Sequence, residues 1–276
     1  YCDGGFGNRF NALVSGLVIA KTLDLSPRIV WPLNNWCGAS MAELLEQPLP
    51  GENRELLTFV PEKDRYQFFM VEDHLTLGVP WESPLHMPSW DAARAYLARS
   101  ERDVFYYTAL IPGFIDFDSV AEQVRGLRFH PEIVARTRAF LHERGLSDFY
   151  GVQIRKTDFG RNGADDNNLF ELIARAPHRR FFVCSDDKAV EERFGALPNA
   201  AIYPKRAHVE KLVDGGWNSV TTDHSGRAYA CNVNRSAASV QDALVDLLIL
   251  ARSQIVRTSQ STFLNTALLL KQAGVA

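Results

Sequence analysis

The chain has 276 residues, of which 46% are hydrophobic and 23% are charged, and its formal net charge is −3. This length exceeds the usual size of one domain, so we expect one large α/β domain or two moderate ones. The small negative charge provides no electrostatic attraction for a polyanion, which argues against nucleic acid as a partner.

The cysteines and the apolar segments bear on the compartment. Cys2, Cys37, Cys184 and Cys231 are far apart and lack the spacing of a zinc site or a disulfide scaffold, which favours a reducing compartment. No apolar run reaches the roughly 18 to 20 residues that span a membrane. We therefore expect a cytoplasmic protein, with peripheral association at the membrane as the alternative. Because the sequence starts at Tyr1 without a methionine, a short upstream piece such as a first strand is a further expectation.

The N-terminal half begins with a glycine loop, a helix and a strand. Apolar residues from Phe10 to Leu23 recur at helical spacing, and RIVWPL (28–33) has the pattern of a short buried strand. The stretch from about 50 to 118 is rich in proline and aromatic residues, with strand-like pieces at 56–60, 67–71 and 104–107. HPEIVARTRAFLHERG (130–145) then predicts an amphipathic helix.

Strands alternate with helices from residue 148 onward. We expect strands at 148–156, 180–186, 200–204 and 254–258, and helices at 168–176, 188–196, 239–253 and 261–274. This alternation predicts parallel strand pairing with crossover helices, hence a doubly wound sheet. With a boundary near 120–147, the expected architecture is two α/β lobes that face one another across a cleft.

The segment GGFGNR is the first candidate site. A dinucleotide fingerprint needs a glycine where Phe10 stands, which disfavours an NAD-dependent oxidoreductase. Gly5 and Gly7 instead precede a helix whose N-terminal N–H groups could bind an anion, with Asn8 and Arg9 facing it. The alternative is a tight turn that only requires positive φ, and the motif alone does not decide between the two.

A second candidate site follows the strand at 148–156. Gln153 and Arg155 alternate with apolar residues, and such polar side chains are unusual in a strand covered on both faces unless they meet a ligand. The planar guanidinium of Arg155 is suited to bind phosphate. A structural ion pair between Arg155 and Asp158 is the alternative.

Two further strand ends carry polar residues ahead of a helix. Ser185, Asp186 and Asp187 follow the second strand, and a helix N-cap explains one of the three. A metal site is disfavoured there because no histidine or further carboxylate stands at ligand spacing. Ser261 and Thr262 open the last helix, where either anion binding or capping accounts for them. Ligands of open α/β sheets bind at such strand ends.

In this order, the motifs GGFGNR, IVWPLNNWCG (29–38), GVQIRKTD, FFVCSDD and SQSTF resemble the fucosyltransferase superfamily. That superfamily includes the nodulation-type and core α1,6-fucosyltransferases, the α1,2-fucosyltransferases and the protein O-fucosyltransferases, and the nodulation-type branch looks most similar. The resemblance implies a GT-B-type fold of two Rossmann-like lobes: an N-terminal acceptor-side lobe at 1–125 and a C-terminal nucleotide-sugar-binding lobe at 126–276. It also implies GDP-fucose as the donor substrate, a glycan or glycoconjugate acceptor, and no cofactor or metal.

The family's H-x-R-x-x-D motif falls on Gln153, Arg155 and Asp158, so the resemblance implies Arg155 and Asp158 as catalytic residues. Arg155 would grip the diphosphate, while Asp3, Asp73, Asp116 and Asp158 are unranked candidates for the general base. The family's late aspartate, which reads the nucleotide base, falls on Asp246, and its serine pair near the phosphates falls on Ser261 and Thr262. The nucleotide-sugar-binding residues implied are Gly5, Gly7, Asn8, Arg9, Gln153, Ser185, Asp186, Asp187, Asp246, Ser261 and Thr262.

One departure from the family motif affects the expected activity. Gln153 replaces histidine, and an amide cannot take up a proton near neutral pH, so an active enzyme would use Gln153 only for binding. The expected function is an inverting, metal-independent transfer of fucose to a glycan hydroxyl. The alternatives are a non-catalytic nucleotide-sugar or glycan-binding protein of the same fold, and a transferase with another nucleotide-sugar donor.

Overall fold

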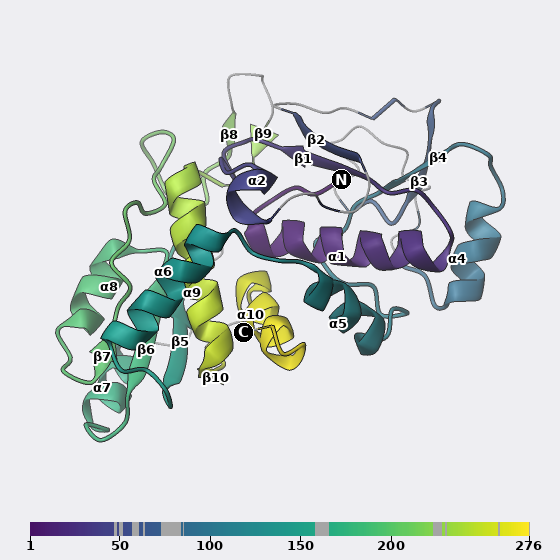
Figure 1. Ribbon diagram of the computed structural model, residues 1–276. Coiled ribbons are helices and arrows are strands. Elements are labelled where there is room, and N and C mark those ends of the chain that lie inside the picture. The colour runs from purple at the N-terminus through teal and green to yellow at the C-terminus, as the bar shows by residue number, and fades with distance from the viewer. Residues whose placement is uncertain are drawn as a thin grey trace. The chain divides into compact units, whose positions relative to one another are not determined.

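The computed structural model describes residues 1–46, 49, 52–56, 61–62, 64–72, 84, 86–157, 166–222, 228–229, 231–258 and 260–275. The chain divides into two compact units. Unit 1 comprises Tyr1–Asn34 and Gln47–Leu127, and unit 2 comprises Asn35–Glu46 and Arg128–Ala276 (Figure 1).

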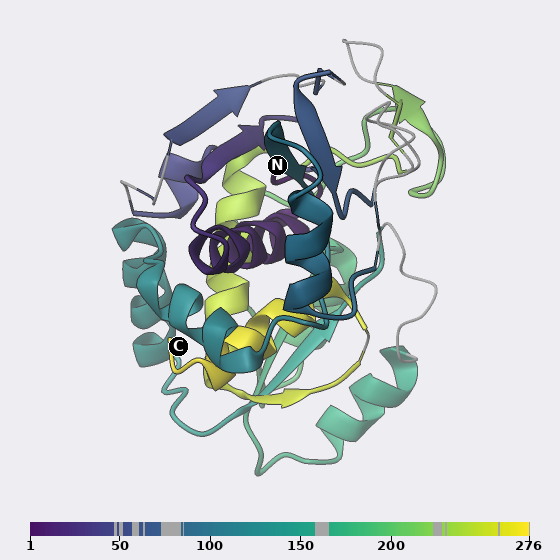
Figure 2. The same ribbon diagram turned by 90° about the vertical axis from the view of Figure 1, so that its right-hand side faces the viewer.

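Unit 1 combines two parallel strand pairs with helices. Its elements are α1 (Phe6–Thr22), β1 (Arg28–Pro32), β2 (Glu52–Leu56), β3 (Tyr66–Phe69), α4 (Trp90–Leu97), β4 (Asp103–Tyr106) and α5 (Phe117–Gly126). Strand β1 pairs with β2, and β3 pairs with β4. In Figure 2 the purple helix α1 is seen almost end-on, with β1 and β2 along one side of it. The Cys2 amide donates to Val30 O and the Tyr1 ammonium donates to Tyr106 O, so the N-terminal residues link β1 to β4.

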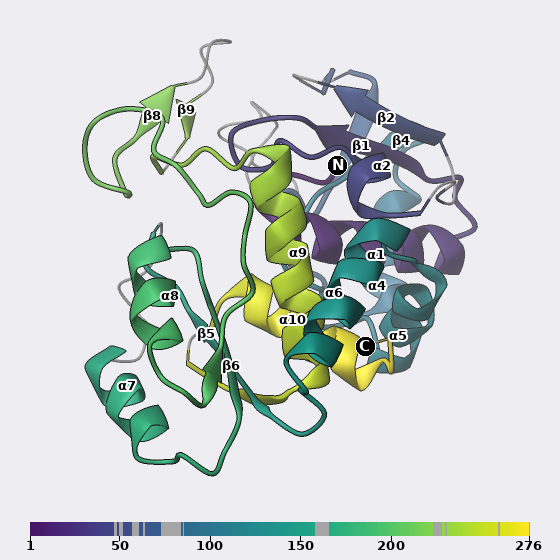
Figure 3. The same cartoon turned by 60° about the vertical axis from the view of Figure 1, so that its left-hand side comes forward.

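Unit 2 is a doubly wound α/β sheet with flanking segments. Its elements are α2 (Met41–Leu44), α6 (Pro131–Glu143), β5 (Tyr150–Ile154), α7 (Asp166–Ala174), β6 (Phe181–Ser185), α8 (Lys188–Gly195), β7 (Ala200–Ala201), β8 (Thr221–Thr222), β9 (Ala228–Tyr229), α9 (Ala237–Arg252), β10 (Gln254–Val256) and α10 (Thr262–Gln272). Four of the strands form one parallel sheet in the order β10-β5-β6-β7. Helices α7 and α8 lie on one side of β5 and β6, and α9 and α10 lie on the other (Figure 3).

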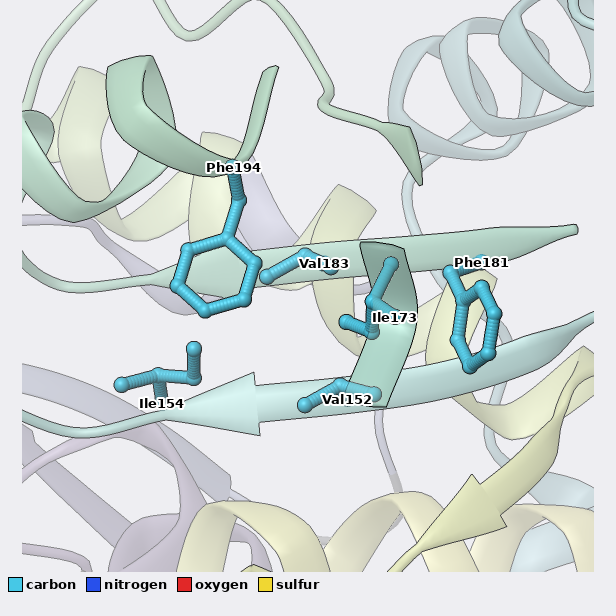
Figure 4. Packing of buried hydrophobic residues seen from close by; sticks show 6 residues of the cluster. All are labelled: Val152, Ile154, Ile173, Phe181, Val183 and Phe194. Carbon is cyan, nitrogen blue, oxygen red and sulfur yellow. The ribbon is translucent and has the colours of Figure 1, made fainter. Parts of the chain in front are cut away.

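The alternation of side chains along β5 and β6 builds a core on each face of this sheet. Val152 and Ile154 of β5 and Phe181 and Val183 of β6 pack with Ile173 of α7 and Phe194 of α8 (Figure 4). On the opposite face, the ring centroids of Phe182 and Phe140 of α6 are 5.9 Å apart. The predicted parallel, doubly wound sheet and the placement of Gln153 opposite the Val152 and Ile154 layer are confirmed.

The sequence prediction was less successful between 50 and 118. Its strands at 67–71 and 104–107 correspond to β3 and β4, whereas 57–60 of the strand at 56–60 lies outside the described residues. The structure adds helix α4, which Ser89 caps at Ala92 N, and helix α5, capped by Asp116, follows at the end of this stretch. Strand β7 is also shorter than predicted, ending at Ala201. No helix among the described residues is long and apolar enough to span a membrane.

Candidate functional site

At the carboxyl edge of the β10-β5-β6-β7 sheet, hydrogen bonds connect several of the residues that the sequence predicts as site residues. Gln153, near the end of β5, is buried, and its Oε1 accepts a hydrogen bond from Ser261 Oγ at 3.1 Å. Thr258, just beyond β10, donates from Oγ1 to Gln153 O. Ser261 Oγ also accepts from Leu264 N at 3.1 Å and so caps α10. The end of β5 is therefore fixed to the N-terminus of α10.

Arg155 lies just beyond β5, partly buried, in a loop that Asp186 holds. Asp186 follows β6, and its Oδ1 accepts from Lys156 N at 2.7 Å while its Oδ2 accepts from Thr157 N at 3.3 Å. Thr157 Oγ1 donates to the same Oδ2. Because these bonds fix the two residues that follow Arg155, the carboxylate of Asp186 positions the loop that presents the guanidinium.

If this edge binds GDP, as the family resemblance implies, Asp186→Ala should weaken that binding about tenfold. The variant should also lower the free energy of unfolding by about 1 to 2 kcal/mol, because hydrogen bonds to a charged acceptor are lost. Calorimetric titration with GDP and urea unfolding measure the two effects. Asp148→Ala is the matched control, since Asp148 accepts from Gln254 Nε2 at the amino end of the sheet and makes no contact at this edge. Unchanged GDP affinity in Asp186→Ala would contradict the positioning role.

Other predicted residues near this edge have visible structural roles. Asp187 is the N-cap of α8, and its Oδ1 accepts from Ala189 N at 2.8 Å. This agrees with the predicted capping role of one residue in this group. Ser185 is buried, and its Oγ accepts from Asp187 N at 3.1 Å. Thr262 is the first residue of α10, where helical N–H groups lack acceptors within the helix. Asp158 lies outside the described residues.

Asp246 belongs to a buried ionic cluster beside the same edge. Lys205 Nζ lies 2.8 Å from Asp246 Oδ2 and 2.5 Å from Glu191 Oε1, and it also donates to Ser185 O. His208 Nε2 is 2.9 Å from Glu191 Oε2. Glu191 Oε1 further accepts from Ser185 N at 2.9 Å. Lys205 thus links the ends of β6 and β7 to helices α8 and α9.

Burial and charge act in opposite senses on these groups. Burial raises the pKa of Asp246 to about 7, although the Lys205 ammonium lowers it. Burial alone lowers the pKa of Lys205, but the Asp246 and Glu191 carboxylates raise it above its usual value. Burial also raises the pKa of the Cys184 thiol, which therefore stays protonated at neutral pH.

The segment that carries Lys205 is fastened to α9 by a second buried aspartate. Asp242 is fully buried and lies one helical turn before Asp246. The Oδ2 atom of Asp242 accepts from Arg206 N and from Ala207 N. Its Oδ1 accepts from Arg206 Nε at 3.0 Å and from Arg136 Nη2. Asp242 therefore holds the backbone on the carboxyl side of Lys205.

The GGFGNR segment of unit 1 has the tight turn that was one of its two interpretations. Gly4 has φ +79°, and a Cβ there would lie 2.9 Å from Asn8 Nδ2, so glycine is required at this position. Gly5 is the N-cap of α1, with Gly7 and Asn8 in the first turn of the helix. A Cβ on Gly5 would meet nothing within 4 Å.

Arg9 serves to hold this turn together. Its guanidinium is fully buried and donates from Nε to Gly4 O and from Nη1 to Pro32 O, both at 2.7 Å. Nη2 donates to Asn34 Oδ1 at 3.0 Å and lies 3.4 Å from Asp3 Oδ1. Because all three nitrogens are engaged within unit 1, the expected contact of Arg9 with a diphosphate finds no support in this geometry.

Sequence reasoning missed Lys205, Glu191, His208 and Asp242. The strand-end rule applied to the sequence would have found Lys205, since it directly follows the predicted strand at 200–204. Asp242 and Asp246 are four residues apart in a mostly apolar helix, a spacing that places both carboxylates on one face. Among the residues described, no group of three His, Cys, Asp or Glu side chains could hold a metal ion.

No protein-family model matches this sequence, and no curated protein matches it either. Solved structures do match. NodZ α-1,6-fucosyltransferase soaked with GDP-fucose has a TM-score of 0.56 and 17% identity over 97% of this chain and 89% of that chain. Fucosyltransferase NodZ from Bradyrhizobium has a TM-score of 0.57 and 16% identity, over 97% and 90%. POFUT1 in complex with GDP has a TM-score of 0.52 and 13% identity, over 99% and 94%. The chain therefore has the α/β fold of these fucosyltransferases, which confirms the predicted GT-B-type fold.

Proposed function

We propose that this chain transfers fucose from GDP-fucose to a hydroxyl group of a glycan acceptor, with inversion at the anomeric carbon. The observation that carries the proposal is the joining of Gln153, Ser261 and the Arg155 loop at the carboxyl edge of the sheet. The shared fold supports it, because the similar NodZ and POFUT1 structures include forms with GDP-fucose and GDP. Residues 126–276 are then proposed as the donor-binding part, and residues 1–125 as the acceptor side.

The proposed chemistry depends on stabilising the departing diphosphate. As the bond from fucose to GDP breaks, positive charge grows on the sugar and negative charge grows on the phosphate. Arg155 would stabilise that negative charge more in the transition state than in the bound donor, which is what accelerates the reaction. The N–H groups at the start of α10, beside Ser261, would contribute partial positive charge to the same phosphates. We assign Ser185, Asp186 and Asp187 to shaping this edge.

The structural roles of Asp116 and Asp3 reduce the number of candidates for the general base. Asp116 caps α5 through Ser119, and the hydrogen bond from Ser119 N lowers the pKa of this exposed carboxyl. Asp3 is buried and accepts from Tyr1 Oη, Gly4 N and Asn34 Nδ2. Both carboxylates are occupied in holding local structure. We therefore propose Asp158 as the base and keep Asp73 as the alternative; both lie outside the described residues.

A second candidate function is a nucleotide-sugar-binding protein without turnover. It is favoured by Gln153, whose amide has no proton-transfer capacity and whose Oε1 accepts from Ser261. In the enzyme that we propose, the same bond makes Gln153 a positioning residue. The two functions differ in whether bound GDP-fucose is consumed when an acceptor is present.

Thermal unfolding in the presence of GDP, GDP-fucose, GDP-mannose and UDP-sugars tests the donor. We expect GDP and GDP-fucose to raise the melting temperature, since a ligand at a hundred times its Kd stabilises the native state by about 2.7 kcal/mol. GDP release with a library of glycan acceptors then tests turnover. Binding without GDP release would favour the second candidate, and a preference for UDP-sugars would overturn the proposed donor.

A further inference from the structure

Lys205 is the centre of an ionic cluster in which two carboxylates share one ammonium. The side chains of Lys205, Glu191 and Asp246 are exposed by 6%, 5% and 4%. Burial of three such charges costs free energy, which their mutual pairing offsets only when each group is fully hydrogen-bonded. Glu191 meets this condition, because Lys205, Ser185 N and His208 all contact its two oxygens.

Asp246 does not meet this condition. Its Oδ2 accepts from Lys205, whereas its Oδ1 is buried and has no hydrogen-bond donor within the described part of the chain. A buried acceptor without a donor is destabilising, because it has lost its hydrogen bonds to water. An ionic cluster that satisfies every carboxylate oxygen but this one is suited to receive a donor from a bound molecule.

We propose that Lys205 is a positioning residue for nucleobase specificity, which holds Asp246 by Oδ2 so that Oδ1 accepts hydrogen bonds from guanine. The inference rests on the proposed function, together with the base-reading role that the family resemblance implies for Asp246. Guanine presents two adjacent donors, N1–H and the N2 amino group, to a carboxylate. Uracil presents one N–H between two carbonyl oxygens, which a carboxylate repels, so an ionised Asp246 selects guanine over uracil.

Lys205 also keeps Asp246 ionised. Burial raises the pKa of Asp246 to about 7, and the Lys205 ammonium opposes this rise. Without Lys205 the pKa rises further, and a protonated carboxyl loses acceptor capacity. Glu191 acts in the opposite sense, because a second negative charge raises the pKa of Asp246. The titratable or charged groups that act on Asp246 or on Glu191 are Lys205, Glu191, Asp242, Cys184 and His208.

The segment around Lys205 is held firmly enough for this role. Arg206 N and Ala207 N donate to Asp242, one turn from Asp246 on the same helix. On the other side of Lys205, the ring of Tyr203 contacts the ring of Phe140 at a centroid distance of 5.5 Å. Contacts on both sides therefore fix the backbone from which the Lys205 side chain reaches Asp246.

The first test compares the affinities of GDP, IDP and UDP for the wild-type protein, Lys205→Met and Lys205→Arg, by calorimetric titration at pH 8. All three ligands carry the same diphosphate, so their differences report the base, and IDP lacks only the N2 amino group. We expect Lys205→Met to reduce the preference for GDP over UDP about tenfold or more, and to shrink the difference between GDP and IDP. Lys205→Arg keeps the cation and should stay within about threefold of the wild type.

The second test follows the affinity for GDP-fucose from pH 6 to pH 9 without an acceptor. GDP-fucose has no terminal phosphate that titrates near pH 6, unlike GDP. Below its pKa Asp246 must lose a proton to bind guanine, so affinity falls as the pH decreases through about 7. We expect Lys205→Met to move this midpoint upward and Glu191→Gln to move it downward. His208→Gln shows whether His208 contributes to the midpoint.

These outcomes separate the inference from the proposed function. Circular dichroism and thermal unfolding identify the variants that fold. If Lys205→Met does not fold, Lys205→Arg and Glu191→Gln are compared with the wild type instead. If the wild-type protein prefers GDP and Lys205→Met keeps the same GDP, IDP and UDP ratios, the role of Lys205 is wrong while the proposed function stands. Equal midpoints in all variants would also overturn it. If no guanine nucleotide binds the wild-type protein, the proposed function itself fails.

Discussion

Replacement of Arg155 by alanine is expected to lower kcat for fucosyl transfer about 10² to 10³-fold, with a smaller change in KM. The guanidinium is proposed to meet negative charge that grows on the diphosphate as the donor bond breaks, and loss of such a contact costs about 2.7 to 4 kcal/mol of transition-state stabilisation. Steady-state kinetics with GDP-fucose and an accepted glycan measures the effect. Because Asp186 holds Lys156 and Thr157 through backbone bonds, the loop is expected to keep its conformation in the variant.

Two further variants determine whether this loss is specific. Arg155→Lys keeps the positive charge but removes the planar pair of donors, so its kcat should lie between those of the wild type and Arg155→Ala. Arg175→Ala is the matched control, since Arg175 is exposed on the protein surface and pairs with Glu171 at 2.8 Å. Its kcat should equal that of the wild type. Near-normal turnover in Arg155→Ala would remove Arg155 from the mechanism.

The carboxyl edge of the sheet was predictable because its determinants are local. Alternation along β5 places Val152 and Ile154 on one face and Gln153 on the other, and the structure confirms this division. Each parallel strand must end at the same edge, so the residues that follow β5, β6 and β10 could be assembled from sequence alone. The contact between Gln153 and Ser261 joins residues 108 positions apart, yet it follows from that topology.

Helix α4 was missed for a different reason. Proline and aromatic residues dominate the surrounding stretch, and this composition obscures the local helix signals. Ser89 is an N-cap with Asp91 in the first turn, and this pattern was present in the sequence. Helix α5 has the same signature in Asp116 and Asp118. Capping residues deserved precedence over composition here because they act within one helical turn.

The roles of buried charges could not be read from local sequence. Lys205 follows the predicted strand at 200–204, but only long-range contacts with Glu191 and Asp246 show that its side chain is buried. Arg9 likewise stands at a helix N-terminus, where anion binding and turn structure are equally plausible. Its acceptors Pro32 O and Asn34 Oδ1 come from 23 and 25 residues further along the chain, and these contacts favour the structural role.

Arg9→Met should therefore destabilise unit 1 by about 3 to 5 kcal/mol. The substitution removes a fully buried cation and leaves the Asp3 carboxylate and the oxygens of Gly4 and Pro32 without it, which is the costly way to break a buried pair. The guanidinium also lies 4.9 Å from the centre of the Trp31 ring, so packing is lost as well. Urea unfolding followed by circular dichroism and tryptophan fluorescence measures the change.

Arg28→Met provides the matched control, because Arg28 belongs to the same unit and its pairing with Asp103 at 3.7 Å is solvent-exposed. An exposed ion pair contributes about 0 to 1 kcal/mol, so this variant should unfold almost as the wild type does. The affinity of folded Arg9→Met for GDP distinguishes the two interpretations of Arg9. A structural Arg9 lowers the fraction of folded protein and leaves the affinity of that fraction intact. An Arg9 bound to the diphosphate would instead weaken GDP binding about tenfold or more, because a charge-assisted contact would be lost.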